Sequence, residues 1–175
     1  ITSLSRSYEL LFDYLHEQDE ELLAFVRSKN HPSIESMEDY RRFVETGFFR
    51  TVAQSFMDLG KIGNLPEGPR ALINFAKFMG TPETRDIVDW VYNGGGEMRF
   101  FLTNHFFKDG AAYESEGYNV IHIHGVQEVI DGMNELRRIH PDRYPDAAFP
   151  RLEGDFKYRR LYGFPIEYWL INRTT

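Results

Sequence analysis

Apolar residues recur at three- and four-residue intervals through almost the whole of this 175-residue chain. Residues at these spacings share one face of an α-helix, whereas a half-buried strand requires strict alternation of apolar and polar residues. The pattern therefore predicts an all-α chain of about eight helices, paired by short loops around one core. We expect residues 1–175 to form a single helical domain.

The expected helices end at glycine, proline or asparagine, which interrupt helical patterns for steric and hydrogen-bonding reasons. They are predicted over residues 8–15, 22–26, 36–59, 70–79, 82–93, 98–106, 118–139 and 165–171, with a short helix or packed loop around 149–158. The glycine triplet 94–96 is interpreted as a hinge.

The composition excludes several classes of function. The net charge of −7 argues against nucleic acid as a partner, because binding to phosphates depends on clustered lysine and arginine. The absence of cysteine rules out disulfides and thiolate metal sites. No apolar run reaches the roughly 18 residues that a membrane-spanning helix needs. Aromatic residues make up 15% of the chain, which indicates a phenylalanine-rich core and, alternatively, rings that line a sugar-stacking groove.

The densest group of polar residues lies between 109 and 119. Asp109-Gly110 predicts a turn, Glu114 lies in the following loop, and Tyr118-Asn119 begins a helix. Unpaired backbone N–H groups at a helix N-terminus favour anions. The sequence therefore predicts a short polar cluster at this helix end.

Two of these side chains are suited to proton transfer. Tyr118 and His122 are four residues apart and should share one helical face, where a phenol and an imidazole can exchange protons. The alternative is a core tyrosine and a hydrogen-bonded core histidine. Glu114 and Glu116 form a candidate carboxylate pair, and the alternative is a solvated loop with one carboxylate near the helix dipole.

The histidines do not predict a metal site. His122 and His124 point about 200° apart on a helix, so one ion cannot easily bind both. His105 lies within an apolar stripe and is interpreted as a core histidine. We expect neither a metal nor a cofactor.

The order of these motifs resembles the helical domain of heparinase II/III-like polysaccharide lyases. Gly63-Asn64, the segment Thr81 to Trp90, Asp109-Gly110 with Glu114, Gly117-Tyr118-Asn119 and His140-Pro-Asp-Arg-Tyr144 carry the resemblance, which covers residues 40–175. It implies an (α/α) toroid-type domain, here an incomplete toroid that is a fragment of a longer multidomain protein. It also implies a periplasmic or secreted parent with a C-terminal β-sandwich domain.

The activity implied by the resemblance is eliminative cleavage of a uronic-acid polysaccharide. Tyr118 would carry the proton, Asn64 would neutralise the uronate carboxylate and Glu114 would orient groups in the cleft. His122 completes the candidate catalytic set. We expect substrate contacts from three further residues, Asn119, Arg70 and Trp90, although a surface salt bridge is the alternative role for Arg70.

The first motif departs from the family pattern. Related sequences often read Gly-Asn-Phe-Gly-Met-His-Gln, whereas this chain has Gly68 and Pro69 where the histidine and glutamine are expected. Two alternatives therefore stay open: a non-catalytic carbohydrate-binding domain and a helical scaffold or interaction module. The interaction module predicts a wide exposed apolar patch.

Overall fold

The computed structural model describes residues 2–17, 20–29, 33–60, 66–79 and 84–172. In these ranges the chain is helical and forms no strand, which confirms the predicted all-α class. The α-helices are α1 (Thr2–His16), α2 (Glu20–Ser28), α3 (Met37–Arg42), α4 (Arg50–Leu59), α5 (Glu67–Met79), α6 (Arg85–Asn93), α7 (Phe101–His105), α8 (Glu116–Ile139) and α9 (Phe156–Asn172). The π-helix η1 (Phe43–Phe49) joins α3 to α4, and η3 (Met98–Phe100) and η4 (Leu152–Gly154) are short 3₁₀ turns.

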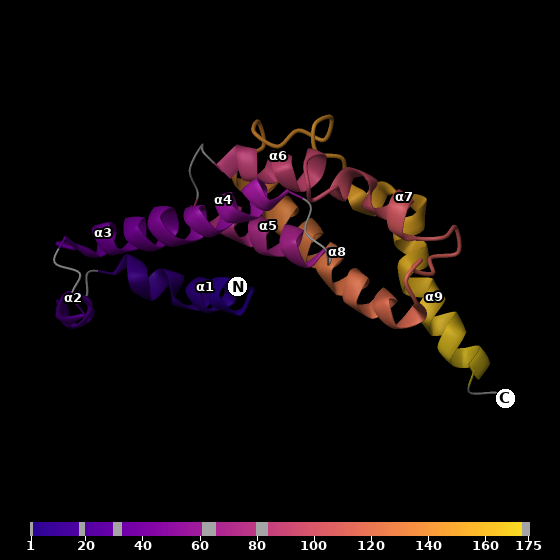
Figure 1. Cartoon of the computed structure of the whole chain (residues 1–175), viewed down its shortest axis with the longest axis horizontal. Coiled ribbons are helices and arrows are strands. Elements are labelled where there is room, and N and C mark those ends of the chain that lie inside the picture. The colour runs from indigo at the N-terminus through magenta and orange to yellow at the C-terminus, as the bar shows by residue number, and fades with distance from the viewer. Residues whose placement is uncertain (1, 18–19, 30–32, 61–65, 80–83, 173–175) are drawn as a thin grey trace.

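The helices form an elongated arch with α2 near one end and the last turns of α9 at the other (Figure 1). The centre of the arch is α5, which packs on α8, α6 and α1. Its residues Leu72, Phe75 and Ala76 are fully buried, as their helical spacing predicted. A single cluster of buried apolar side chains continues from α1 through this centre to Leu161 of α9.

The helix predicted over 36–59 is not α-helical throughout. Ser36 begins it with a capping box, in which its hydroxyl accepts a hydrogen bond from the Asp39 N–H and the Asp39 carboxylate accepts one from the Ser36 N–H. The π-helix η1 then holds more residues per turn than an α-helix, so the apolar stripe slips by one position. As a result Phe49 is buried, whereas Phe48, which the α spacing placed in the core, is exposed.

An open apolar groove of about 470 Å³ lies between α1 and η1. Its walls include Leu11, Tyr14, Phe43 and Phe48, all of which are largely exposed. Tyr8 also lines it, and the Tyr8 hydroxyl donates a hydrogen bond to Glu45 at 2.7 Å. Burial and this neighbouring carboxylate raise the pKa of Tyr8 well above its usual value.

Two expectations about loops and the C-terminal segment were wrong. The glycine triplet is a packed turn rather than a hinge, because a Cβ at Gly95 would lie 2.7 Å from the Gly60 carbonyl oxygen and one at Gly96 2.5 Å from that of Val91. At the C-terminal end, a single helix α9 passes through Pro165, whereas the sequence predicts a separate helix that begins there. Proline removes only one backbone donor, which a helix tolerates by bending.

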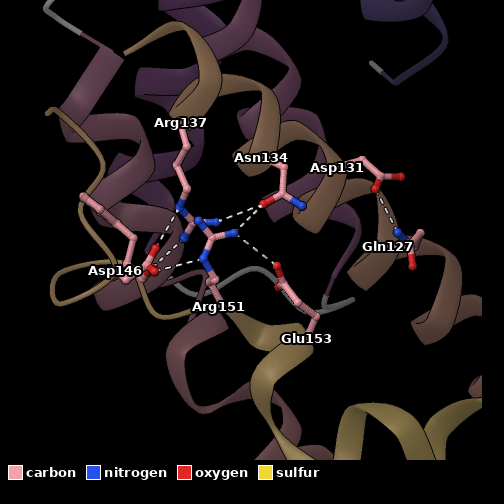
Figure 2. A network of polar contacts seen from close by, with 8 residues as sticks. Gln127, Asp131, Asn134, Arg137, Asp146, Arg151 and Glu153 are labelled. Carbon is pink, nitrogen blue, oxygen red and sulfur yellow. Dashed lines mark hydrogen bonds and ion pairs between the residues drawn. The ribbon is translucent and has the colours of Figure 1, made fainter. Parts of the chain in front are cut away.

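The segment between α8 and α9 is fastened to the end of α8 by a polar network (Figure 2). Asp146 pairs with Arg137 and Arg151, and Asn134 accepts hydrogen bonds from both guanidinium groups. Arg137 also donates to the Phe149 carbonyl at 2.6 Å. This network holds the segment between α8 and α9 against the end of α8, and the chain then turns so that α9 packs on α8.

Candidate functional site

The predicted turn at Asp109-Gly110 forms and rests on α9. The Gly110 N–H donates to the Phe107 carbonyl, and the Phe107 N–H donates to the Ala111 carbonyl at 2.9 Å. Gly110 has a φ of +95°, which favours glycine, and a Cβ there would lie 2.3 Å from the Arg160 carbonyl oxygen. The loop from 106 to 113 is therefore positioned directly against the first half of α9.

Asn119 holds this loop to the start of α8. Its side chain is fully buried, its Oδ1 accepts a hydrogen bond from the Ala112 N–H at 2.9 Å, and its Nδ2 donates to the Gly110 carbonyl at 2.6 Å. The sequence suggested a substrate contact at this position. In the structure both polar atoms of Asn119 are bonded to the loop, so that its observed role is to position the loop.

Tyr118, His122 and Glu114 come together where α8 begins. The Tyr118 side chain is 43% exposed, whereas His122 is only 3% exposed and lies beneath it, with the two ring centroids 5.9 Å apart. The Nε2 atom of His122 is 3.5 Å from Oε2 of Glu114, whose side chain is exposed. A solvent-accessible phenol, an imidazole and a carboxylate are thus contiguous.

Aromatic rings surround the other sides of His122. Phe101 and Phe106 contact it edge-on at centroid distances of 5.6 and 5.5 Å, and His105 stacks on Phe101 at 4.8 Å. These contacts, together with the Tyr118 ring on another side, fix the imidazole plane and keep both ring nitrogens buried. His105 belongs to this aromatic packing, in agreement with its interpretation as a core histidine.

Arg70 lies in a separate charged cluster. Its guanidinium group is 2.6 Å from Glu67 and 3.5 Å from Glu128, and Arg6 of α1 binds the same Glu128 oxygen. Glu128 follows Tyr118 by ten residues on α8, which corresponds to about 15 Å along the helix axis. The structure therefore gives Arg70 the alternative role of an ion pair and does not bring it to Tyr118.

Trp90 also lies away from the group formed by Tyr118, His122 and Glu114. It is part of α6, near the middle of the arch, whereas α8 begins close to α9 (Figure 1). The Trp90 ring occupies the space beside Gly95, where a Cβ would lie 2.5 Å from the ring. Its contacts thus belong to the packed glycine turn.

Asn64 lies outside the described residues. The chain is described again from Pro66, whose ring fills the space beside Gly125 of α8, where a Cβ would lie 2.1 Å from Cγ of the proline. Gly125 is three residues from His122. The segment that follows Asn64 is therefore anchored one helical turn from the buried imidazole.

The sequence did not identify two exposed aromatic rings beside this site. Phe107 and Tyr113 flank the turn, are each about half exposed, and meet edge-to-face with centroids 4.4 Å apart. Their position on either side of Asp109-Gly110 was the available signal, because a tight turn brings its flanking side chains together.

No cluster of three or more histidine, aspartate or glutamate side chains in the described ranges is arranged to hold a metal ion. Among the same residues, no helix has the length and apolar character needed to cross a membrane. Comparison with family models, curated proteins and solved structures finds no match to this chain.

Proposed function

We propose that the chain is a polysaccharide lyase-like domain and that its parent cleaves a uronic-acid polysaccharide by β-elimination. The observation that supports this most is the accessible Tyr118 phenol directly above a buried His122 that contacts Glu114. An enzyme that catalyses β-elimination needs a group that can exchange a proton with the substrate. It also needs hydrogen-bond donors or positive charges that stabilise the anionic intermediate.

In the proposed reaction the proton on C5 of the uronate leaves, the bond from C4 to the glycosidic oxygen breaks, and a C4–C5 double bond forms. Tyr118 removes the C5 proton and then donates this proton to the leaving glycosidic oxygen, so that the site neither gains nor loses a proton. Glu114, whose carboxylate faces Nε2 of His122, orients the imidazole beside Tyr118. Asn64 keeps its proposed role of neutralising the carboxylate.

We also propose that the arch of helices is part of an (α/α) toroid and that the parent acts in the periplasm or outside the cell. The arch has the helical content that such a ring requires. The candidate site lies at the end of the arch where α7, α8 and α9 meet (Figure 1).

The experiment that tests the function measures product formation by the intact parent protein. Polygalacturonate, alginate and glycosaminoglycans are supplied separately, and the ultraviolet absorbance of unsaturated uronate ends is followed. We expect an increase with at least one acidic polymer and none with neutral dextran. Hydrolysis that yields saturated ends, or no cleavage of any acidic polymer, would contradict a lyase.

A non-catalytic carbohydrate-binding domain is the second candidate function. It is favoured by the exposed pair Phe107 and Tyr113, since exposed aromatic rings offer flat apolar surfaces on which sugar rings can stack. Binding of acidic oligosaccharides by the parent without formation of unsaturated ends would identify this function.

The third candidate, a helical interaction module, is favoured by the exposed apolar groove between α1 and η1. It predicts that a charged substitution in the groove, such as Val44→Asp, abolishes association with a partner protein and leaves sugar binding unchanged.

A further inference from the structure

Most basic side chains among the described residues are already engaged by carboxylates or backbone carbonyls. Arg50 pairs with Asp86, Lys77 with Glu9 and Arg138 with Glu135. Besides Lys29, which lies over the Phe25 ring, and Arg143, three cations differ, because no carboxylate or hydrogen-bond acceptor in the described ranges engages the charged groups of Lys108, Arg159 and Arg160. All three side chains are exposed.

Two of these cations line a pocket at the start of α9. The pocket has a volume of about 420 Å³ and is lined by Gly154, Phe156, Arg159 and Arg160. The Arg160 guanidinium carbon lies 6.0 Å from the centroid of the exposed Phe156 ring, within the range of a cation–π contact. This volume is in the range of small-molecule sites, and its lining combines an aromatic face with two guanidinium groups.

The nearest carboxylates are directed elsewhere. Oδ1 of Asp155 accepts a hydrogen bond from the Lys157 N–H at 2.7 Å, and Oδ1 of Asp109 accepts one from the Ala111 N–H at 3.0 Å. Glu153 is 3.6 Å from Arg151. Among the described residues no carboxylate pairs with Arg159 or Arg160, so both guanidinium groups remain available to an anion, although Asp155 lies beside them in the sequence and the whole chain carries a net charge of −7.

The helix that carries the pocket residues packs against the loop that carries Phe107 and Tyr113. Gly110 of that loop lies against the Arg160 backbone, and Nζ of Lys157 donates to the Phe106 carbonyl at 2.6 Å. Asn119 joins the same loop to the start of α8, where Tyr118 lies. A polymer that contacts Tyr118 and crosses the loop would therefore reach Arg159 and Arg160.

We propose that the pocket lined by Phe156, Arg159 and Arg160 is an anion subsite, which binds a carboxylate or sulfate group on a sugar ring of the same chain that reaches Tyr118. This inference rests on the proposed function, since it specifies the substrate as acidic on more than one sugar. The planar guanidinium fork matches the two oxygens of a carboxylate or sulfate, and Phe156 supplies a stacking face for the ring.

The test compares two double variants of the whole chain. The first, Arg159→Ala with Arg160→Ala, removes both positive charges from the pocket. The matched control, Arg42→Ala with Arg138→Ala, removes the same charge elsewhere. These two arginines are exposed on α3 and α8 and pair only within their own helices. Binding to polygalacturonate, heparin and neutral dextran is measured by affinity electrophoresis, and thermal melts verify that both variants are folded.

We expect the pocket variant to bind the acidic polymers at least tenfold more weakly and with a smaller dependence on salt, while the control stays within about twofold of the wild type. A loss with both polygalacturonate and heparin identifies a carboxylate as sufficient, and a loss with heparin alone identifies a sulfate. Equal losses in the two variants, unchanged affinity of the pocket variant, or no acidic-polymer binding by the wild type would each overturn the subsite.

Two further outcomes separate this inference from the proposed function. If the parent forms no unsaturated product but the pocket variant loses acidic-polymer binding, the lyase fails and the subsite stands. If product forms and the pocket variant keeps its KM and affinity, the subsite fails and the lyase stands. A variant that loses only its binding to phosphatidylserine vesicles would assign the pocket to a membrane surface and overturn the proposal.

Discussion

Asn119 shows at the residue scale how a side chain without solvent contact can determine the shape of a site. Its amide links the turn at Gly110 to the first turn of α8 and so sets where Phe107, Tyr113 and Glu114 lie relative to Tyr118. The free energy that it contributes comes from satisfying buried backbone groups, which would otherwise lose their partners without regaining water.

We predict that Asn119→Ala lowers the free energy of unfolding by about 1–3 kcal/mol, because the Ala112 N–H and the Gly110 carbonyl lose their buried partner. Urea denaturation measures this difference. Asn104→Ala, at an exposed position of α7, is the control and should change the value by less than about 0.5 kcal/mol. Equal effects of the two substitutions would mean that the amide does not hold the loop.

The sequence predicted some of these residue positions and not others. Tyr118 and His122 are neighbours because a four-residue spacing on a helix makes them so. The burial of His122 and the exposure of Tyr118 depend on α7 and its loop, which cover only one of the two rings. Asn119 gave no distinct signal, because an asparagine at a helix start is equally suited to a loop contact and to a ligand.

The contact between α5 and α8 is the tightest packing at the scale of the helical elements. Gly132 of α8 faces Ile73 of α5 so closely that a Cβ would lie 2.3 Å from the Ile73 Cγ2 atom. Ile73 is fully buried and branched at Cβ, so its methyl group has little freedom to move. A glycine at this point allows the two helices at the centre of the arch to approach each other.

Two alanine substitutions at glycines should therefore have opposite effects. Gly132→Ala is expected to destabilise the protein by about 1–3 kcal/mol, because the added methyl group overpacks the α5–α8 contact. Gly163→Ala, in α9 with no atom within 4 Å of the new methyl group, should stabilise it by up to about 1 kcal/mol through helix propensity. Thermal melts measure the change in melting temperature, which should fall for Gly132→Ala and rise for Gly163→Ala. Stabilisation by Gly132→Ala would contradict the close packing.

Helical periodicity predicted most of the elements, and its failures have local causes. The buried faces of α5 and α8 follow the three- and four-residue pattern closely, because both helices are straight neighbours in the core. The π-helix η1 was not predicted, because it changes which residues face the core without changing the composition of the segment. Pro165 is a typical first residue of a helix, so the pattern predicts a start at a position that lies inside α9.

The molecule as a whole separates two kinds of surface. The apolar groove lies between α1 and η1 on one arm of the arch, and the aromatic and basic surface around Tyr118 and Arg160 lies on the other, where α7, α8 and α9 meet (Figure 1). Sequence patterns do not predict this separation, because it depends on how α5 and α8 cross at the centre. The central claim concerns the second surface, where Tyr118 is proposed to carry the proton.

The most direct test is the turnover of acidic polysaccharide by the intact parent protein carrying Tyr118→Phe. Removing the phenolic hydroxyl should lower kcat by at least about 100-fold, the usual contribution of a positioned acid–base group, with the melting temperature and polymer affinity unchanged. Tyr113→Phe is the matched control, since it removes the hydroxyl from a similarly exposed tyrosine in the loop before α8 and keeps its ring. Full turnover by Tyr118→Phe, or an equal loss in both variants, would contradict the assignment of Tyr118 as the proton carrier.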